Sequence, residues 1–179
     1  VTHVVAEVSS HAVDMKRVDD CDFDLGIFTN LTRDHLDYHV TMENYFQAKK
    51  RFFAEILPRS KKSHAHKMVI NADDPWGRRI VQEVSLPALT YGIAKDCAIK
   101  ALNYELSLNG IKAEINLAGD TVFIKSPLIG KFNLYNILAA WGAAFILHIP
   151  IPVIKKGIEK LSHVPGRLEA VVASAGFNV

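Results

Sequence analysis

Short apolar segments alternate with amphipathic ones between residues 24 and 92. Asp24–Thr29, Lys67–Asn71 and Ala88–Tyr91 are apolar and have the length of buried strands. We predict helices over Thr41–Ile56 and from Pro75 to about residue 84, because each opens on a capping residue and carries an apolar face. Strands that alternate with helices in this way form a parallel sheet. We therefore expect an α/β fold, with a mostly parallel sheet flanked by helices.

The pattern changes after Asp96, where an antiparallel β meander is predicted. Asn109–Gly110 is a strong hairpin signal between two alternating segments. A third segment follows, and then two helical stretches that are rich in apolar residues. The strands are expected at Ala98–Leu108, Ile111–Leu117 and Thr121–Lys125, and the helices within Leu128–Leu147 and Ile151–Leu161.

The chain opens on a β-branched apolar segment, Val1–Val8, which is predicted to be a buried strand. Glu7 near its end is costly to bury unless it is paired or holds a cation. The chain begins within this segment and without a methionine, so we expect a piece of a longer enzyme. A linker is predicted at Val164–Arg167, which places one domain at residues 1–164 and the start of another at 165–179.

Composition excludes several classes of function. The 179 residues carry a net charge of +2, which is too even a balance to indicate a nucleic-acid partner. No apolar run reaches the ~18 residues that a membrane span needs. Cys21 and Cys97 lie far apart without CxxC spacing, which is typical of reduced thiols in a cytosolic protein.

Titratable side chains are densest at Asp34–His39, directly after a predicted strand. Ligands in open α/β sheets bind outside the carboxyl ends of strands, so this is the first place to expect chemistry. Carboxylates favour Mg²⁺, whereas paired histidines such as His35 and His39 favour Zn²⁺. A helix N-terminus rich in capping aspartates and hydrogen-bonded histidines is an equal alternative on spacing alone.

Lys49 lies on a mostly apolar helix face, where a lysine usually extends its amine to water. The functional alternative is a lysine at a metal or phosphate site. No GxxxxGK[ST] loop occurs in the chain, so a phosphate-binding loop would have to precede Val1.

Seven short motifs follow one another along the chain, each weak alone and together highly specific. With them the chain resembles the Mur ligases, most closely the branch that forms the tripeptide precursor, and the resemblance covers nearly the whole chain. The motifs are EVSSH at 7–11, FTNLTRDHLDYH at 28–39, AK at 48–49, NADD at 71–74, TYG at 90–92, GKFNLYN at 130–136 and VPGRLE at 164–169.

The resemblance implies the central, ATP-binding domain of a three-domain enzyme, without its first strand and phosphate loop. The implied reaction adds meso-diaminopimelate or L-lysine to UDP-MurNAc-L-Ala-D-Glu through an acyl phosphate made from ATP. The fragment alone is expected to be inactive. A related folylpolyglutamate- or cyanophycin-type ligase, a zinc hydrolase using His35 and His39, and a nucleotide-binding module without turnover are the alternatives.

The resemblance also implies roles for single residues. Glu7 and His35 match residues that hold Mg²⁺, and Lys49 matches a lysine that is carbamylated, so that a cation becomes an anion able to support the metal. Ser9 and Arg17 match residues that contact the UDP-muramoyl dipeptide, where a guanidinium suits carboxylate or phosphate. The nucleotide would lie near Asn133, Asn136 and Arg167, while His11 and Asp73 are functional or structural with equal weight.

Two residues depart from the family pattern. Met15 stands where these ligases commonly have glutamine, so one polar substrate contact would be missing. Val40 replaces the usual glycine after Asp-Tyr-His, which is expected to alter the turn before the helix of Lys49. Neither residue belongs to the implied metal ligands.

Overall fold

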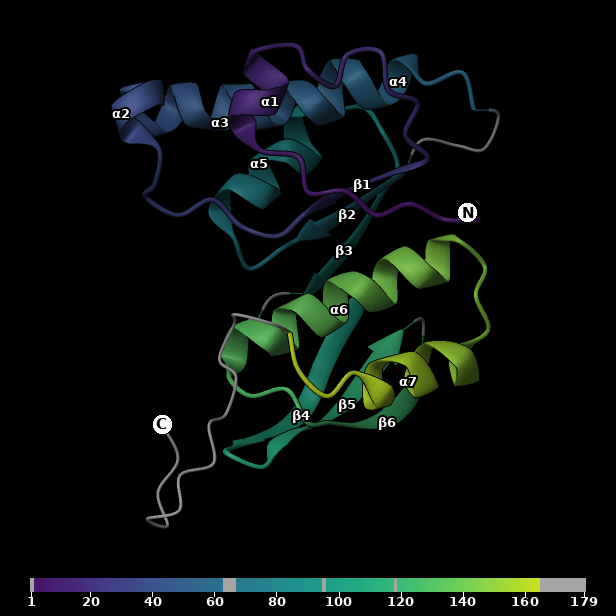
Figure 1. Ribbon diagram of the computed structural model, residues 1–179. Coiled ribbons are helices and arrows are strands. Elements are labelled where there is room, and N and C mark those ends of the chain that lie inside the picture. Colours follow the sequence, from purple (N-terminus) through teal and green to yellow (C-terminus); the bar gives the residue numbers. More distant parts are fainter. Residues whose placement is uncertain (1, 63–66, 95, 118, 165–179) are drawn as a thin grey trace. The chain divides into compact units, whose positions relative to one another are not determined.

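The computed structural model describes residues 2–62, 67–94, 96–117 and 119–164. The chain divides after Cys97 into two compact units, and Figure 1 labels the elements of both. The division falls where the predicted pattern changes from parallel to antiparallel. The part of the chain that follows the predicted domain boundary, residues 165–179, lies outside the described residues.

The first unit contains a parallel sheet. Strands β1 (Leu25–Phe28), β2 (Lys67–Asn71) and β3 (Ala88–Gly92) pair in that order, with Phe28 opposite Ile70 and Ile70 opposite Thr90. The side chains of Met68, Val69 and Ile70 in β2 are all fully buried, so both faces of the strand are covered. The α/β prediction for this part of the chain is confirmed.

The long helix that follows β1 has three parts. It runs through α3 (Met42–Arg51), a π-helical turn η1 (Phe52–Ile56) and α4 (Leu57–Arg59). Thr41 is the N-cap, as predicted, and its hydroxyl accepts from the backbone N–H of Asn44 at 3.1 Å. The helix is predicted to end at Ile56, but it continues through Pro58 to Arg59. Proline has no N–H to donate to the preceding turn, and the wider π turn lies directly before it.

Aromatic side chains from this helix form the core of the first unit. Phe46, Phe52 and Phe53 are buried, and the Phe53 ring lies 6.3 Å from that of Phe28 in β1. Gly26 lets the helix approach the sheet, since a Cβ there would lie 2.8 Å from the Phe53 ring and 2.9 Å from the Phe52 ring. Helix α5 (Pro75–Glu83) is capped by Asp74, as predicted.

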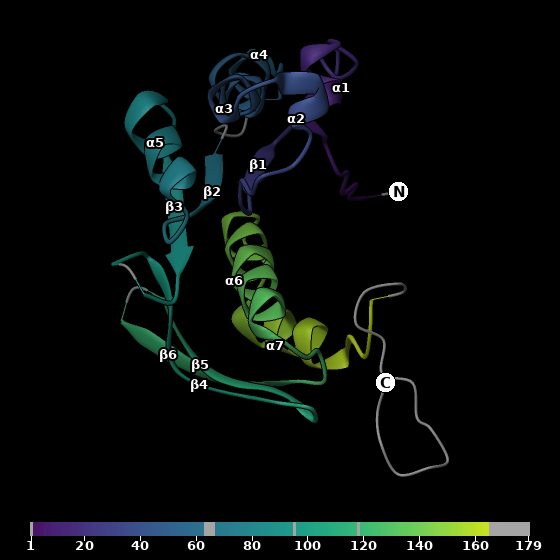
Figure 2. The ribbon, with the colours of Figure 1, turned by 90° about the vertical axis from the view of Figure 1, so that its left-hand side faces the viewer.

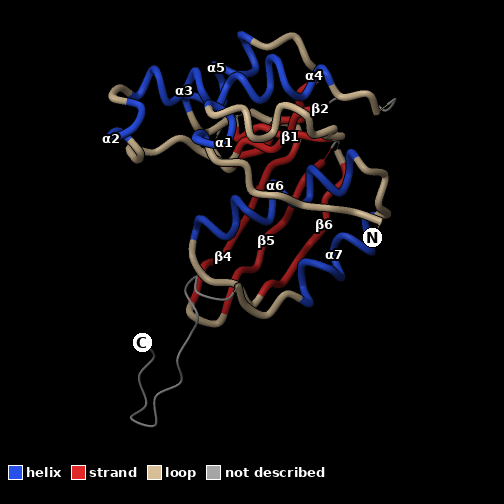
Figure 3. The backbone as a smooth tube through the Cα atoms, turned by 45° about the horizontal axis from the view of Figure 1, so that its top comes forward, coloured by secondary structure: helices blue, strands red, loops and turns tan. Residues whose placement is uncertain are grey.

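The strand predicted at Val1–Val8 is wrong for the residues that the structure describes. Residues 2–9 are irregular, and Figure 3 draws them as loop leading into the short helix α1 (Ser10–Asp14). Val4 and Val5 are 82% and 94% exposed. A strand needs a neighbour that completes its ladder of hydrogen bonds, and in the described parts of the chain β1 pairs only with β2. An apolar pattern therefore could not by itself place this segment in the sheet.

The second unit contains the predicted meander. Strands β4 (Ile99–Ser107), β5 (Gly110–Leu117) and β6 (Asp120–Ser126) pair antiparallel in sequence order. Gly110 follows the turn with a φ of +120°, which only glycine adopts easily, and a Cβ there would lie 2.2 Å from the carbonyl oxygen of Ser126. Helices α6 (Lys131–Ile146) and α7 (Ile151–Lys160) cover one face of this sheet (Figure 2).

Candidate active site

The loops after β1 and β2 are joined by side-chain hydrogen bonds. Asp74 accepts from the backbone N–H groups of Trp76 and Gly77 through one oxygen, and from that of Leu31 at 3.0 Å through the other. Asn71 donates its amide to the carbonyl of Thr29 at 2.8 Å. The carboxyl ends of both strands are therefore fixed relative to each other, which anchors the start of the Asp34–His39 loop.

His35 ends this loop in the left-handed conformation, with a φ of 53°, immediately before the short helix α2 (Leu36–His39). Asp34 accepts the backbone N–H of His35 at 2.8 Å, which supports that conformation. The His35 side chain is 44% exposed, and its ring lies edge-on to the ring of His11 at 5.0 Å. The imidazole is thus held on the surface of the unit and remains accessible to a ligand.

The link between α2 and α3 is a single-residue turn at Val40. The backbone of Val40 has φ 67° and ψ −46°, and the N–H of Thr41 donates to the carbonyl of His39 at 2.7 Å. This is a γ-turn with positive φ, a conformation that is rare and strained for a β-branched residue. Whether this turn differs from that of family members with glycine stays a prediction. Asn44 reinforces the turn by donating its side-chain amide to the same carbonyl at 3.0 Å.

His39 is buried beneath this turn. Its Nε2 lies 2.9 Å from the Ser10 hydroxyl, which comes from α1. Burial lowers the pKa of His39, and the neighbouring His11 acts in the same direction. The neutral imidazole is therefore favoured, and the ring serves as a packed, hydrogen-bonded element of the site.

Tyr45 stacks on His39 from the first turn of α3. The two rings lie 5.0 Å apart with an interplanar angle of 12°, and the Tyr45 side chain is buried. His35 approaches the same tyrosine edge-on, with 5.9 Å between ring centroids. Burial also raises the pKa of the Tyr45 phenol, so the hydroxyl stays protonated at neutral pH.

Lys49 follows Tyr45 by one helical turn and is half-buried. Its Nζ lies over the Tyr45 ring, 5.4 Å from the centroid. Burial lowers the pKa of the Lys49 amine, while the negative charge of Glu7 acts in the opposite direction. The sequence-predicted residues Glu7, His35 and Lys49 therefore lie in one neighbourhood, with Tyr45 in contact with two of them.

Other residues of this neighbourhood have structural partners. His11 contacts the rings of His35, Tyr38 and His39, and the Tyr38 hydroxyl donates to Asp14 at 2.7 Å. These contacts tie α1 to α2, so the structural role of His11 is supported.

Asp73 lies away from this cluster, at the start of the turn before α5. Its carboxylate accepts the backbone N–H groups of Ile93 at 2.6 Å and Ala94 at 3.1 Å, which fixes the segment after β3. The structural reading of Asp73 is supported as well.

The zinc alternative gains no support from the geometry. His39 directs its Nε2 to Ser10, and His35 belongs to the loop that precedes α2. Across the described ranges, no group of three histidine, cysteine, aspartate or glutamate side chains is placed to hold a metal ion. A lysine is not a ligand while it carries a proton, so the candidate set of Glu7, His35 and Lys49 becomes a donor set only if Lys49 is modified.

The residues predicted to contact the substrate lie around α1. Ser9 is the N-cap of this helix, and its hydroxyl accepts the backbone N–H of Ala12 at 3.1 Å. Arg17 and Met15 are exposed shortly after the helix, with Met15 at 47%. The capping role of Ser9 explains its presence without a ligand. The substrate contacts of Ser9 and Arg17 stay a prediction.

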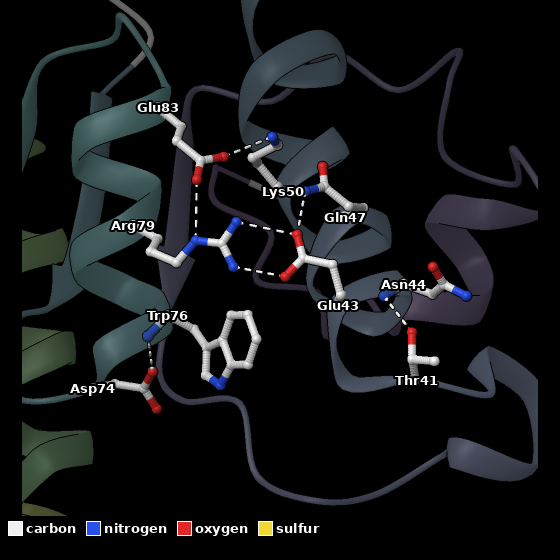
Figure 4. Close-up of polar contacts among 9 residues, drawn as sticks. All are labelled: Thr41, Glu43, Asn44, Gln47, Lys50, Asp74, Trp76, Arg79 and Glu83. Carbon is white, nitrogen blue, oxygen red and sulfur yellow. Dashed lines mark hydrogen bonds and ion pairs between the residues drawn. The ribbon is translucent and has the colours of Figure 1, made fainter.

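Charged residues of α3 and α5 that point toward one another join the two helices (Figure 4). The Arg79 guanidinium contacts both oxygens of Glu43, at 2.7 and 3.1 Å, and its Nε contacts Glu83 at 3.0 Å. Lys50 donates to the second oxygen of Glu83 at 2.7 Å. Arg79 and then Gln47 lower the pKa of Glu43 to about 2. Lys49 and Lys50 thus both lie over rings, of Tyr45 and Phe46, and Lys50 is also held by the ion pair with Glu83.

The predicted nucleotide residues belong to the second unit or lie outside the described residues. Asn133 is 5% exposed and donates its amide to the carbonyl of Ile129 at 2.8 Å, while its oxygen accepts from Asn136 at 3.3 Å. Asn133 therefore orients the exposed Asn136 on α6. Arg167 lies outside the described residues.

Sequence reasoning missed the parts played by Ser10, His39 and Tyr45. The spacing of Tyr45 and Lys49, four residues apart on one predicted helix, was a usable signal for their contact. The partnership of Ser10 with His39 joins residues 29 positions apart, and no local pattern indicates it.

Residues 1–144 match the sequence model of the Mur ligase middle domain. The chain belongs to the Mur ligase family. Its curated relatives include UDP-N-acetylmuramoyl-L-alanyl-D-glutamate--2,6-diaminopimelate ligase of Geobacter metallireducens, 45% identical over 98% of this chain and 34% of that protein. Proteins of the same name in Geobacter sulfurreducens and Bacillus licheniformis are 46% and 41% identical, covering 98% and 100% of this chain and 35% and 37% of theirs. This Mur ligase chain thus spans about a third of the length of these relatives.

Solved structures of other ligases share the fold of this chain. One, described as UDP-N-acetylmuramoyl-L-alanyl-D-glutamate--2,6-diaminopimelate ligase, has a TM-score of 0.80 and 29% identity, covering 93% of this chain and 34% of its own. The MurF ligase of Thermotoga maritima, in complex with ADP, has a TM-score of 0.73 at 20% identity and covers 93% of this chain and 36% of its own, which shows the fold alone. Among the helices that the structure describes in this Mur ligase chain, none combines the length and apolarity needed to cross a bilayer.

Proposed function

We propose that this chain is the ATP-binding central part of a ligase that joins diaminopimelate to UDP-MurNAc-L-Ala-D-Glu. The observation that carries the proposal is the 45% identity, over nearly the whole chain, to a relative named for that reaction. L-Lysine is the alternative amino acid. A solved relative of the same fold contains ADP, which supports ATP as the nucleotide.

The first step of the proposed reaction brings together two negatively charged groups, the γ-carboxylate of D-glutamate and the phosphates of ATP. The γ-carboxylate of D-glutamate attacks the γ-phosphorus of ATP, so that a C–O–P bond forms and ADP leaves. The amine of the diamino acid then attacks the acyl carbon, phosphate leaves with the C–O bond electrons, and one amine proton passes to solvent. ATP and a carboxylate repel each other, so the site must neutralise the transferring phosphoryl group.

Glu7, His35 and a carbamylated Lys49 form a donor set that fits Mg²⁺. Carboxylate and carbamate oxygens are hard ligands of the type that Mg²⁺ prefers, and an imidazole can add to them. Bound Mg²⁺ would supply positive charge beside the phosphates. The support in this structure is that Lys49 lies within the electrostatic reach of Glu7 and shares the Tyr45 ring with His35.

The environment of Lys49 suits carbamylation. Only the neutral amine has a lone pair that can attack the carbon of CO₂, and burial lowers the pKa of Lys49 and thus increases the neutral fraction. A new N–C bond forms, one N–H proton leaves to solvent, and the side chain changes from a cation to an anion. The change reverses the sign of the Lys49–Glu7 interaction, so the carbamate and Glu7 repel unless a cation lies between them.

The remaining site residues are assigned by position. Ser9 and Arg17 are proposed to contact the UDP-muramoyl dipeptide, with the exposed guanidinium of Arg17 suited to an anionic group. Asn136, oriented by Asn133, is proposed to contact the adenine, and Arg167 to lie near the nucleotide.

The test is a ligation assay with a full-length protein that carries this chain. With UDP-MurNAc-L-Ala-D-Glu, diaminopimelate, ATP and Mg²⁺, we expect one ADP released per amide formed. We expect no ADP when the nucleotide sugar is omitted, and no continued release of ADP beyond a single turnover when the amino acid is omitted. The 179-residue chain alone is expected to give no product. ATP-independent hydrolysis with tight Zn²⁺ binding by the chain would instead support the hydrolase and overturn the proposal.

A further inference from the structure

We propose that the stacked rings of His39 and Tyr45 form a platform that fixes the position of the Lys49 side chain. Both rings are positioning residues, because neither is proposed to touch substrate or nucleotide. The platform is expected to favour carbamylation of Lys49, and this part rests on the proposed function. The position of the Lys49 amine over the Tyr45 ring does not depend on that function.

The platform is built from two parallel rings. His39 and Tyr45 lie 5.0 Å apart at an interplanar angle of 12°, and both side chains are buried, at 6% relative exposure each. Lys49 Nζ lies over the Tyr45 ring at 5.4 Å from its centroid. Tyr45 therefore contacts both His39 and Lys49 and links the buried imidazole to the amine.

His39 is held at both its side chain and its backbone. On the side-chain end, His39 Nε2 lies 2.9 Å from the Ser10 hydroxyl in α1. On the backbone end, its carbonyl accepts the N–H of Thr41 at 2.7 Å and the amide of Asn44 at 3.0 Å. The backbone bonds fix the position of the residue, and the bond to Ser10 restricts rotation of the ring that stacks on Tyr45.

Lys49 and the neighbouring Lys50 both lie over an aromatic ring, but their charged partners differ. Lys50 Nζ lies 5.7 Å from the centroid of Phe46 and also forms an ion pair with Glu83, which retains its charge. Lys49 ends over the face of a ring, which attracts an ammonium group weakly and leaves a neutral amine without a fixed acidic partner. A buried ring also excludes water from one side of the amine. A flexible side chain with several rotatable bonds is thereby directed toward the neighbourhood of Glu7.

The first arm of the test measures position directly, by NMR of the 179-residue chain labelled at lysine. The face of an aromatic ring shifts nearby protons upfield, so the Lys49 Hε protons are expected upfield of those of the exposed Lys112, the Lys49 signal being assigned by its absence in Lys49→Arg. Tyr45→Phe keeps the ring and is expected to keep the shift. Tyr45→Leu removes the ring and is expected to move the signal to the position of Lys112.

The second arm measures carbamate with ¹³C-labelled bicarbonate at fixed pH and with Mg²⁺ present, because a cation is expected to offset the repulsion between the carbamate and Glu7. The carbamate signal of Lys49 is expected to be retained in Tyr45→Phe and to fall severalfold in Tyr45→Leu. Ser10→Ala is the second variant, because it loosens His39 without changing either ring that Lys49 could contact. Ser10→Ala is expected to reduce partly both the upfield shift of the Lys49 Hε protons and the carbamate signal. Circular dichroism and thermal unfolding establish that each variant is folded.

The outcomes separate the platform from the proposed function. An upfield shift that depends on the ring, without carbamate in any variant, supports the platform and contradicts carbamylation. A Lys49 signal that is the same in wild type, Tyr45→Phe and Tyr45→Leu overturns the platform. The platform is also overturned if the carbamate signal is undiminished in both the Tyr45→Leu and the Ser10→Ala variants while each is folded.

Discussion

Thr41 donates its backbone N–H to the carbonyl of His39 across a single residue, at 2.7 Å. The intervening Val40 has φ 67°, and its side chain is 74% exposed, so no burial compensates for the conformation. The chain therefore keeps a strained turn at the point where it presents His39 to Tyr45 and begins the helix of Lys49.

Val40→Gly is expected to stabilise the chain by about 0.5–1 kcal/mol. Removing the Cβ relieves the positive-φ strain of about 1–2 kcal/mol, and the larger entropy of an unfolded glycine offsets about half of that gain. Val40→Ala is the matched control, because it keeps a Cβ and is expected to remain within about 0.5 kcal/mol of wild type. Denaturant unfolding measures both. Equal stabilities of the glycine and alanine variants would show that the turn is unstrained.

Gly77→Ala is expected to destabilise the chain by about 1–3 kcal/mol, although alanine is the better helix former. A Cβ at Gly77 would lie 2.2 Å from the carbonyl oxygen of Asn71, so α5 would have to move away from the end of β2. The free energy of unfolding in denaturant gives the effect.

The control for Gly77 is another helical glycine, in α7. Gly157 is exposed, and a Cβ there would meet nothing within 4 Å. Gly157→Ala is therefore expected to stabilise by up to about 1 kcal/mol. Opposite signs at the two positions are the expected result, and a stabilising Gly77→Ala would contradict the close approach of α5 to β2.

The ion pairs between α3 and α5 are expected to make stability depend on acid pH. Hydrogen bonds from Arg79 and Gln47 lower the pKa of Glu43 to about 2, from an ordinary value of 4.5. Above pH 4.5 the carboxylate is ionised in both folded and unfolded chains, and its full stabilisation is present. As pH falls below 4.5 the unfolded chain takes up the proton first, so the stabilisation is lost progressively down to about pH 2.

Glu43→Gln tests this dependence, because it removes the titrating group and keeps the side chain's size. The stability advantage of wild type over the variant is expected to be larger at pH 6 than at pH 3, as measured by denaturant unfolding at each pH. An advantage of the same size at both pH values would contradict the lowered pKa of Glu43.

The strands and capped helices between residues 24 and 126 could be predicted because their signals are local. Lys67–Asn71 was placed without error, since it is apolar throughout and ends on the Asn-Ala-Asp-Asp-Pro sequence that caps α5. Val1–Val8 was misplaced because pairing depends on a neighbour and not on the segment's own composition. The extension of the helix past Pro58 depended on a π turn that no sequence pattern announced.

The candidate site was predictable only in part. The density of titratable residues at Asp34–His39 and the odd lysine at position 49 are visible in the sequence, and the family resemblance gave them roles. The stack of His39 on Tyr45 and the anchor at Ser10 depend on tertiary packing. They also depend on a turn at Val40 whose backbone angles a valine does not suggest.

The central claim is that Lys49 acts as a carbamate in an ATP-dependent ligase. The most direct measurement is the ligation rate of the full-length protein carrying Lys49→Ala, with and without added formate, whose carboxylate can take the place of the missing anion. We predict that the variant is nearly inactive, and that formate restores part of the rate without affecting wild type. A variant that keeps the wild-type rate, or that a small amine restores while formate does not, would contradict the account.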